Sequence, residues 1–231
     1  MNWLIIAAGG NGERMQLRFN KVFAKIGQKP ILYWTLKQFE ESAVIDKMII
    51  SIRESDMAET YTLIKKYQLK KITRIIKADN SRQVSTFSVL KQMRGRIKSN
   101  DLVGIHNAVN PFVTSGEIKA VFQQALSHQA ALLARPATDT VKITNGERLV
   151  HHTPLREKTW YAQTPQVAIF KYLWQAFKKA EQDDFWGTDD TQLLEKIGVK
   201  AKIVPCSHLN IKITFPEDLM LAERILKNFQ P

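Results

Sequence analysis

The sequence predicts an α/β fold built on a mostly parallel sheet with helices on both faces. Short apolar runs alternate with amphipathic segments as far as Pro136. Within those segments apolar residues recur every three or four positions, which is the spacing of one helix face. Regular alternation of strand and helix indicates parallel strands joined by crossover helices. The first apolar run also ends in a glycine-rich turn, a common link between a strand and the element that follows it.

Five strands and four helices are expected in this first part of the chain. The apolar runs place strands at residues 3–8, 48–52, 72–76, 102–105 and 130–134. The amphipathic segments place helices at residues 31–39, 56–67, 82–93 and 115–128. Ligands of such sheets bind at the carboxyl ends of the strands. The glycine turn and the loop at residues 106–111 are therefore expected to form walls of a binding site.

The alternation stops after Pro136. Residues 139–166 are polar, and an Asn145-Gly146 pair between two short β-prone stretches indicates a hairpin. Two isolated strands cannot bury their own faces. We therefore expect one domain, residues 1–231, with residues 137–166 as a protruding β-arm used for dimerisation.

The remaining segments return to the α/β pattern. Helices are expected at residues 170–183 and 189–197, and a strand at residues 200–204. A capping-box pattern from Thr214 to Glu217 predicts the start of a last helix at residues 217–229.

The composition limits the functions that the chain can have. The net charge of +12 suits a phosphorylated substrate and would also suit nucleic acid. The cations are spread along the chain without a nucleic-acid-binding motif, so a solvated surface is favoured and nucleic-acid binding is a minor alternative. No apolar stretch is long enough to span a membrane. One cysteine and no leader-like N-terminus predict a cytoplasmic protein without membrane contact.

The glycine turn is the most informative local feature. Gly9, Gly10 and Gly12 follow an apolar run, and Arg14 and Lys21 come soon after. Glycines let backbone N–H groups point at an anion, and the cations could neutralise phosphate charge. The spacing fits neither the dinucleotide-binding fingerprint nor the P-loop. A tight turn beside ordinary surface cations is the alternative interpretation.

An ordered series of short motifs resembles a known enzyme family. The series consists of residues 8–15 with Lys21, then residues 82–85, 138–142, 163–166, 188–190 and 210–214 with 216–218. It resembles the 2-C-methyl-D-erythritol 4-phosphate cytidylyltransferases and is also similar to the ribitol-5-phosphate cytidylyltransferases. The Thr-Asp-Thr-x-Lys and Asn-Ile-Lys-Ile-Thr motifs favour the first branch.

The resemblance implies a fold and a reaction. The fold would be a Rossmann-like nucleotidyltransferase fold with a protruding β-arm, and the protein would be a homodimer. The enzyme would join CTP and a polyol phosphate to give a CDP-polyol and pyrophosphate, assisted by a divalent ion, usually Mg²⁺. A non-catalytic nucleotide-binding protein on the same scaffold is the alternative.

The resemblance also implies roles for individual residues. Arg14, Lys21 and Lys212 would be catalytic, the lysines acting on one phosphorus and the arginine on the leaving pyrophosphate. The nucleotide would contact Ala8, Gly9, Gly10, Gly12, Asn80, Arg82, Ser85 and Ala108. The polyol phosphate would contact Thr164, Thr188 and, from the arm of a neighbouring subunit, Thr140 and Arg156. Plainer interpretations exist: Lys212 could face solvent, and Arg82 and Ser85 could simply open a helix capped by Asn80.

Five positions depart from the family pattern. Asn107 and Asn110 stand where the family loop has an aspartate and an arginine. The aspartate is the expected metal contact, so Asn107 would be a weaker, uncharged one. Ala78 and Asp79 stand where the family has a glycine pair near the nucleotide, and Asn20 replaces a proline before Lys21.

Overall fold

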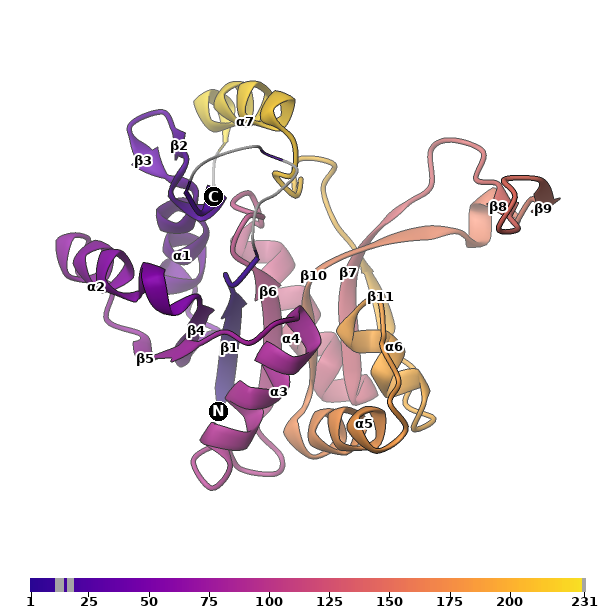
Figure 1. The fold of residues 1–231 in the computed structure, drawn as a ribbon, viewed down its shortest axis with the longest axis horizontal. Coiled ribbons are helices and arrows are strands. Elements are labelled where there is room, and N and C mark those ends of the chain that lie inside the picture. The colour runs from indigo at the N-terminus through magenta and orange to yellow at the C-terminus, as the bar shows by residue number, and fades with distance from the viewer. Residues whose placement is uncertain (11–14, 16–18, 230–231) are drawn as a thin grey trace.

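A seven-stranded sheet forms the centre of the molecule (Figure 1). The computed structural model describes residues 1–10, 15 and 19–229. The strand order is β11-β7-β10-β6-β1-β4-β5, with β10 antiparallel to both neighbours and the other pairs parallel. The strands are β1 (Asn2–Ala7), β4 (Lys47–Ile52), β5 (Ile72–Lys77), β6 (Leu102–Asn107), β7 (Ala130–Pro136), β10 (Trp160–Ile169) and β11 (Lys202–Pro205). The predicted fold class is confirmed.

Helices cover both faces of this sheet because its strands are apolar on both sides. Leu4 and Ile6 of β1 belong to one buried cluster, whereas Trp3 and Ile5 belong to the other. Side chains of α1 and α4 join the first cluster, and those of α3 and α5 join the second. The helices are α1 (Ile31–Glu41), α2 (Met57–Lys66), α3 (Arg82–Met93), α4 (Ser115–His128), α5 (Phe170–Gln182), α6 (Asp190–Glu195) and α7 (Pro216–Asn228). Short 3-10 turns are η2 (Lys21–Phe23), η3 (Glu54–Asp56) and η4 (Arg156–Lys158).

Three local expectations were wrong or incomplete. Strand β10, which lies between β6 and β7, was expected to be part of the arm. A small hairpin of β2 (Lys25–Ile26) and β3 (Lys29–Pro30) was not expected. The last helix is capped by Asp218, not Glu217: the Asp218 carboxylate accepts the N–H groups of Thr214 and Phe215 at 2.7 and 2.9 Å.

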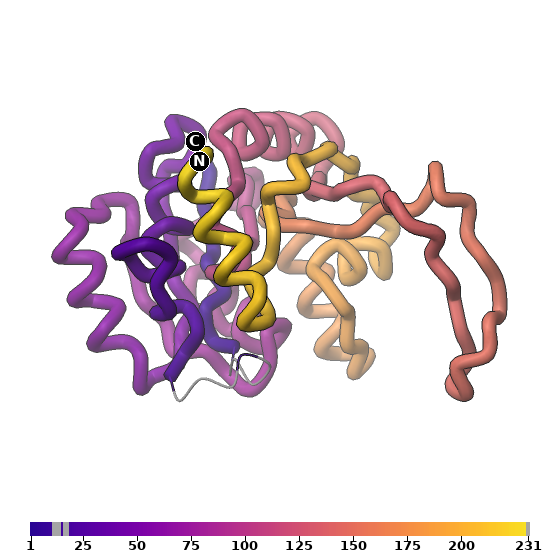
Figure 2. The backbone as a smooth tube through the Cα atoms, turned by 90° about the horizontal axis from the view of Figure 1, so that it is seen from above, coloured from indigo at the N-terminus to yellow at the C-terminus, as the bar shows by residue number. Residues whose placement is uncertain are grey.

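The arm extends far from the body of the molecule, as Figures 1 and 2 show. Its tip is a two-stranded antiparallel sheet of β8 (Ile143–Thr144) and β9 (Val150–His152). Across the parts of the chain that the structure describes, no helix has both the length and the apolar character needed to cross a membrane.

Candidate active site

A cleft of about 780 Å³ opens at the carboxyl ends of the parallel strands. Strands β1, β4, β5 and β6 all end at it, as the topology of parallel sheets predicts. Four cationic side chains contribute to its described lining. The lining residues are Ala7, Ala8, Gly9, Gly10, Asn20, Lys21, Val22, Ser51, Arg53, Ala78, Asp79, Asn80, Ser81, Arg82, Ser85, Thr86, Asn107, Val109 and Lys212.

The two lysines that the sequence singled out line this same cleft, although 191 positions separate 21 from 212. Lys21 is only 9% exposed and begins the short turn η2. Lys212 lies in an irregular segment, not in the strand that was considered for it. Its neighbour Ile213 is fully buried and donates its N–H to the Val109 carbonyl at 2.9 Å. These anchors hold Lys212 at the cleft.

Close packing requires glycine in this turn, in addition to the predicted binding of an anion by its backbone. A Cβ atom placed on Gly9 would lie 2.4 Å from the Cβ of Ala78, so only glycine fits there. Gly10 has open space around its Cα. Both line the cleft, as does Ala8. Gly12 and Arg14 lie outside the described residues, so their predicted roles stay predictions.

The loop after β5 is closed by Ser85. The Asp79 N–H donates to the Ser85 hydroxyl oxygen at 2.9 Å, and this hydroxyl lies 2.6 Å from the Ser81 carbonyl. Ser81 caps α3 by accepting the Val84 N–H, so the alternative interpretation of Asn80 as the cap was wrong. Asn80 instead lies exposed at the cleft.

Arg82 is clamped at the cleft wall. Its two terminal nitrogens donate to the Asp190 carboxylate at 2.9 and 2.6 Å, and its Nε donates to Asn107 Oδ1 at 3.3 Å. The Asp190 side chain is 3% exposed. Burial alone would lower the pKa of Arg82, but the Asp190 carboxylate outweighs burial and the pKa is raised. Gln166 of β10 holds the far side of the clamp, because its Oε1 accepts the Asp190 N–H at 2.9 Å.

The two asparagines of the departing loop contact each other. Asn107 Nδ2 donates to Asn110 Oδ1 at 3.3 Å, and Asn110 Nδ2 lies 3.5 Å from Gln163 Oε1 on β10. Behind them His106 is fully buried, and burial lowers its pKa to about 3. Its ring is therefore neutral at neutral pH, and Nε2 donates to the Asn110 carbonyl at 3.0 Å. Neutral amides thus fill positions where the family pattern has a charged pair.

Other predicted residues are not part of the described lining of this cleft. Ala108 is fully buried, its N–H bonded to Ala7 and its carbonyl to Thr35. The Thr164 hydroxyl accepts the Asn107 N–H at 3.3 Å. Thr140 and Arg156 are exposed on the arm.

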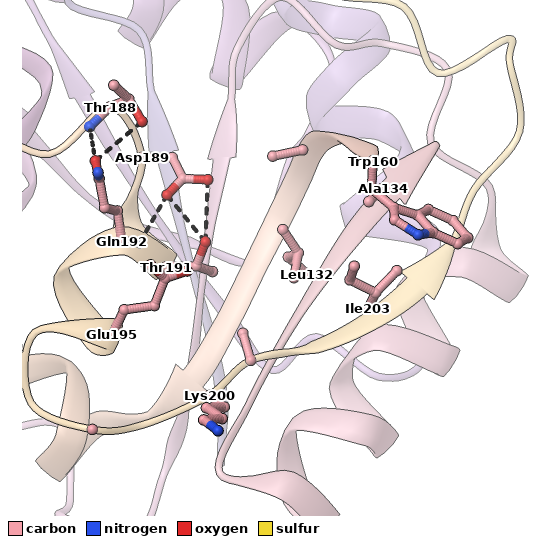
Figure 3. A pocket seen from close by; sticks show the side chains of 13 residues that line it. Leu132, Ala134, Trp160, Thr188, Asp189, Thr191, Gln192, Glu195, Lys200 and Ile203 are labelled. Carbon is pink, nitrogen blue, oxygen red and sulfur yellow. Dashed lines mark hydrogen bonds between the residues drawn. The ribbon is translucent and has the colours of Figure 1, made fainter. Parts of the chain in front are cut away.

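Thr188 lines a second cavity of about 630 Å³, between α6 and the sheet (Figure 3). Its hydroxyl donates to Gln192 Oε1 at 3.2 Å. Trp160 and Ile203 form the apolar side of this cavity, opposite Thr188 and Asp189. Within a single chain, Thr188 therefore lines a different cavity from the one that Lys21 and Lys212 line.

Sequence reasoning missed two functional candidates. Arg53 lines the cleft, and Asp190 holds Arg82. Arg53 directly follows the apolar run of β4, so the strand-end rule that selected the glycine turn would have found it. Nothing in the sequence linked Asp190 to a partner 108 positions away.

Fold and cleft together define a class of protein. A mostly parallel sheet with a glycine turn and several cations at its strand ends is an arrangement of enzymes that bind nucleotide phosphates. A family model described as 2-C-methyl-D-erythritol 4-phosphate cytidylyltransferase matches residues 2–228. The chain therefore belongs to the 2-C-methyl-D-erythritol 4-phosphate cytidylyltransferase family, within the nucleotidyltransferase enzymes.

Individual relatives match this chain over nearly its whole length. The protein of that name from Syntrophus aciditrophicus is 40% identical over 224 residues, covering 96% of this chain and 94% of the relative. The one from Halalkalibacterium halodurans is 39% identical over 223 residues, with 96% of each covered. The crystal structure of 4-diphosphocytidyl-2C-methyl-D-erythritol synthase from Anaerococcus prevotii has a TM-score of 0.85 at 30% identity, covering 98% of this chain and 96% of that one. The resemblance found in the sequence motifs is confirmed.

Proposed function

We propose that this enzyme transfers the cytidylyl group of CTP to 2-C-methyl-D-erythritol 4-phosphate, giving the CDP-polyol and pyrophosphate. The observation that carries the proposal is that Lys21 and Lys212 line one cleft together with the glycine turn. The relatives named for this reaction, at 39% and 40% identity, favour it over the ribitol-phosphate branch.

In the proposed reaction, an oxygen of the polyol phosphate attacks the α-phosphorus of CTP. The bond from that phosphorus to the bridging oxygen breaks, and pyrophosphate leaves with the electron pair. Negative charge gathers on the pentavalent phosphorus, where the ammonium groups of Lys21 and Lys212 stabilise it. Arg14 is proposed to neutralise the pyrophosphate. Little covalent chemistry is needed from the protein, whose main task is to position the two phosphates.

The remaining predicted residues are proposed to bind the substrates. Backbone groups of Ala8, Gly9, Gly10 and Gly12 would enclose the nucleotide, together with Asn80, Arg82, Ser85 and Ala108. Thr164 and Thr188 would close the polyol pocket.

A divalent ion is proposed to enter as the Mg²⁺ complex of CTP. Over the residues that the structure describes, no group of three or more His, Cys, Asp or Glu side chains could hold a metal ion. The Asn107 oxygen, the predicted weak metal contact, already accepts a hydrogen bond from Arg82. These residues do not fit a resident metal ion, so no step above depends on one.

The arm is proposed to form a homodimer and to bring Thr140 and Arg156 to the partner's polyol site. Apolar side chains are exposed along it: Ile143, Leu149, Val150 and Leu155. Exposed apolar clusters of this kind mark protein interaction surfaces. A cytoplasmic location and the absence of a nucleic-acid partner remain predictions from the composition.

The test is pyrophosphate release from CTP and Mg²⁺ with a panel of polyol phosphates. We expect release with 2-C-methyl-D-erythritol 4-phosphate, and formation of the CDP-polyol in equal amount. Faster release with ribitol 5-phosphate would overturn the choice of substrate. Saturable CTP binding without release from any member would instead support the nucleotide-binding alternative.

A further inference from the structure

Asn20 is a buried polar residue directly before the predicted catalytic Lys21. Its side chain is 1% exposed and uses both of its polar atoms. Asn20 Nδ2 donates to the Ala8 carbonyl at 3.1 Å and to Asp56 Oδ2 at 2.8 Å. Its Oδ1 accepts the Val22 N–H at 3.3 Å. One side chain therefore joins the end of β1, the turn η2 and the turn η3.

The same Asp56 oxygen also holds Arg53. Arg53 Nε donates to Asp56 Oδ2 at 2.7 Å, and the Arg53 side chain is 30% exposed at the cleft. This bond uses one of the five N–H donors of the guanidinium, and its terminal nitrogens can form further bonds. A guanidinium held in this way suits phosphate, which it can bind through two parallel hydrogen bonds.

We propose that Arg53 is a further phosphate-binding residue of the nucleotide cleft, and that Asn20 is the positioning residue for Lys21. Asp56 links the two, since its carboxylate contacts both Arg53 and Asn20. The proposal rests on the proposed function, because it assigns the bound phosphate to the triphosphate of CTP. It adds a cation from the end of β4 to those from η2 and from the segment before α7.

The Arg53 part is tested with Arg53→Gln, which keeps a polar side chain of similar reach without the charge. The matched control is Lys77→Gln, since Lys77 forms an exposed ion pair with Glu54 and is not part of the described cleft lining. We expect R53Q to raise the KM for CTP and the Kd for inorganic pyrophosphate by about tenfold, as for a lost charge-assisted hydrogen bond. The KM for the polyol phosphate should stay within about twofold in both variants. Unchanged CTP and pyrophosphate constants in R53Q, or equal changes in K77Q, would overturn this role.

The Asn20 part is tested with Asn20→Pro. The backbone at Asn20 has φ of −63°, which the proline ring adopts without strain, so this variant removes the side-chain bonds and keeps the local backbone. A small displacement of a catalytic group can cost about 100-fold in rate, and we expect kcat to fall by about tenfold or more. In a Lys21→Ala background the same change should have no further effect on kcat, because Asn20 acts through Lys21.

Two results would contradict the positioning role of Asn20. A full additional loss of kcat in the N20P/K21A double variant, or wild-type kcat in N20P, would overturn the positioning role. Asn20→Ala provides the same comparison if proline impairs folding, with thermal unfolding measured for each variant. Pyrophosphate binding by calorimetry needs no turnover. If the wild type releases no pyrophosphate from CTP, the proposed function fails, whereas the R53Q binding difference still decides whether Arg53 binds phosphate.

Discussion

The cleft and the arm of this protein are built in opposite ways. In the cleft, polar side chains are joined to groups far away in the sequence: Arg82 pairs with the buried Asp190, and the buried Asn20 donates to Asp56. On the arm, Leu149 and Val150 are about 60% exposed, and the tip is a two-stranded sheet. Isolated sheets of this size are marginally stable in water.

We infer from this difference that the cleft positions the substrates and that the arm forms the oligomer. The cleft's geometry is fixed by one chain, because buried hydrogen-bond networks with satisfied members rigidify the groups that they hold. The arm carries apolar surface that only a second surface can bury. We therefore expect changes in the cleft to act on the chemistry without altering the oligomer, and changes at the arm tip to act first on the oligomer.

The largest effect should come from the two lysines. Lys21→Ala and Lys212→Ala each remove a cation that stabilises the transition state, and we expect kcat to fall by roughly 100- to 1,000-fold. Circular dichroism and the oligomeric state should remain those of the wild type. Near-normal turnover in either variant would refute the catalytic assignment of that lysine. Loss of the oligomer would show that residues of the cleft also affect assembly.

The second effect concerns the arm. Leu149→Asp with Val150→Asp places charges where the proposed interface would bury apolar groups. We expect a monomer by analytical ultracentrifugation and a large loss of activity, since Thr140 and Arg156 would no longer reach a partner. The CTP affinity of the monomer should stay close to that of the wild type. A fully active monomer would show that the arm does not complete the site.

The elements that the sequence predicted are those with a strong local pattern. Helices α3 and α4 begin and end where the apolar spacing indicated. Strand β10 was missed because its first half, up to Gln163, is half-buried or exposed and continues the arm. Its second half is buried in the body of the molecule. Its place between β6 and β7 depends on long-range pairing that no local pattern contains.

The candidate site was predictable in part for the same reason. The glycine turn, Lys21 and Lys212 were found from motifs, and the structure brings the described ones together. Arg53 follows from the strand-end rule once β4 is known. The clamp on Arg82 and the bonds of Asn20 join segments that only the folded chain brings together, so their partners could not be read from the sequence.

A third, smaller effect should come from Asp190→Asn. The variant keeps the size of the side chain and removes the charge that pairs with Arg82. We expect the KM for CTP to rise by about tenfold with little change in the KM for the polyol phosphate. The free energy of unfolding should fall by about 1–3 kcal/mol, because Arg82 keeps its charge beside a neutral partner.

The matched control for this change is Asp183→Asn, which breaks an exposed ion pair with Lys179. Exposed pairs contribute little, so its stability should change by less than about 1 kcal/mol and its kinetics should not change. Asp190→Glu should recover part of the CTP affinity if Asp190 positions Arg82 through its charge. An equal rise in KM for both substrates in D190N would point to general loosening instead.

The smallest effect should come from Asn107→Asp, which restores the acid of the family loop. The new carboxylate keeps the acceptor for Arg82 Nε and loses the amide that donates to Asn110. Because an anionic oxygen is a better ligand for Mg²⁺ than an amide oxygen, we expect a few-fold lower Mg²⁺ concentration at half-maximal rate. The guanidinium of Arg82 competes for the same oxygen. If Arg82 retains it, the Mg²⁺ titration will not move and the midpoint of thermal unfolding will rise, which would assign residue 107 to the wall of the cleft and not to the ion.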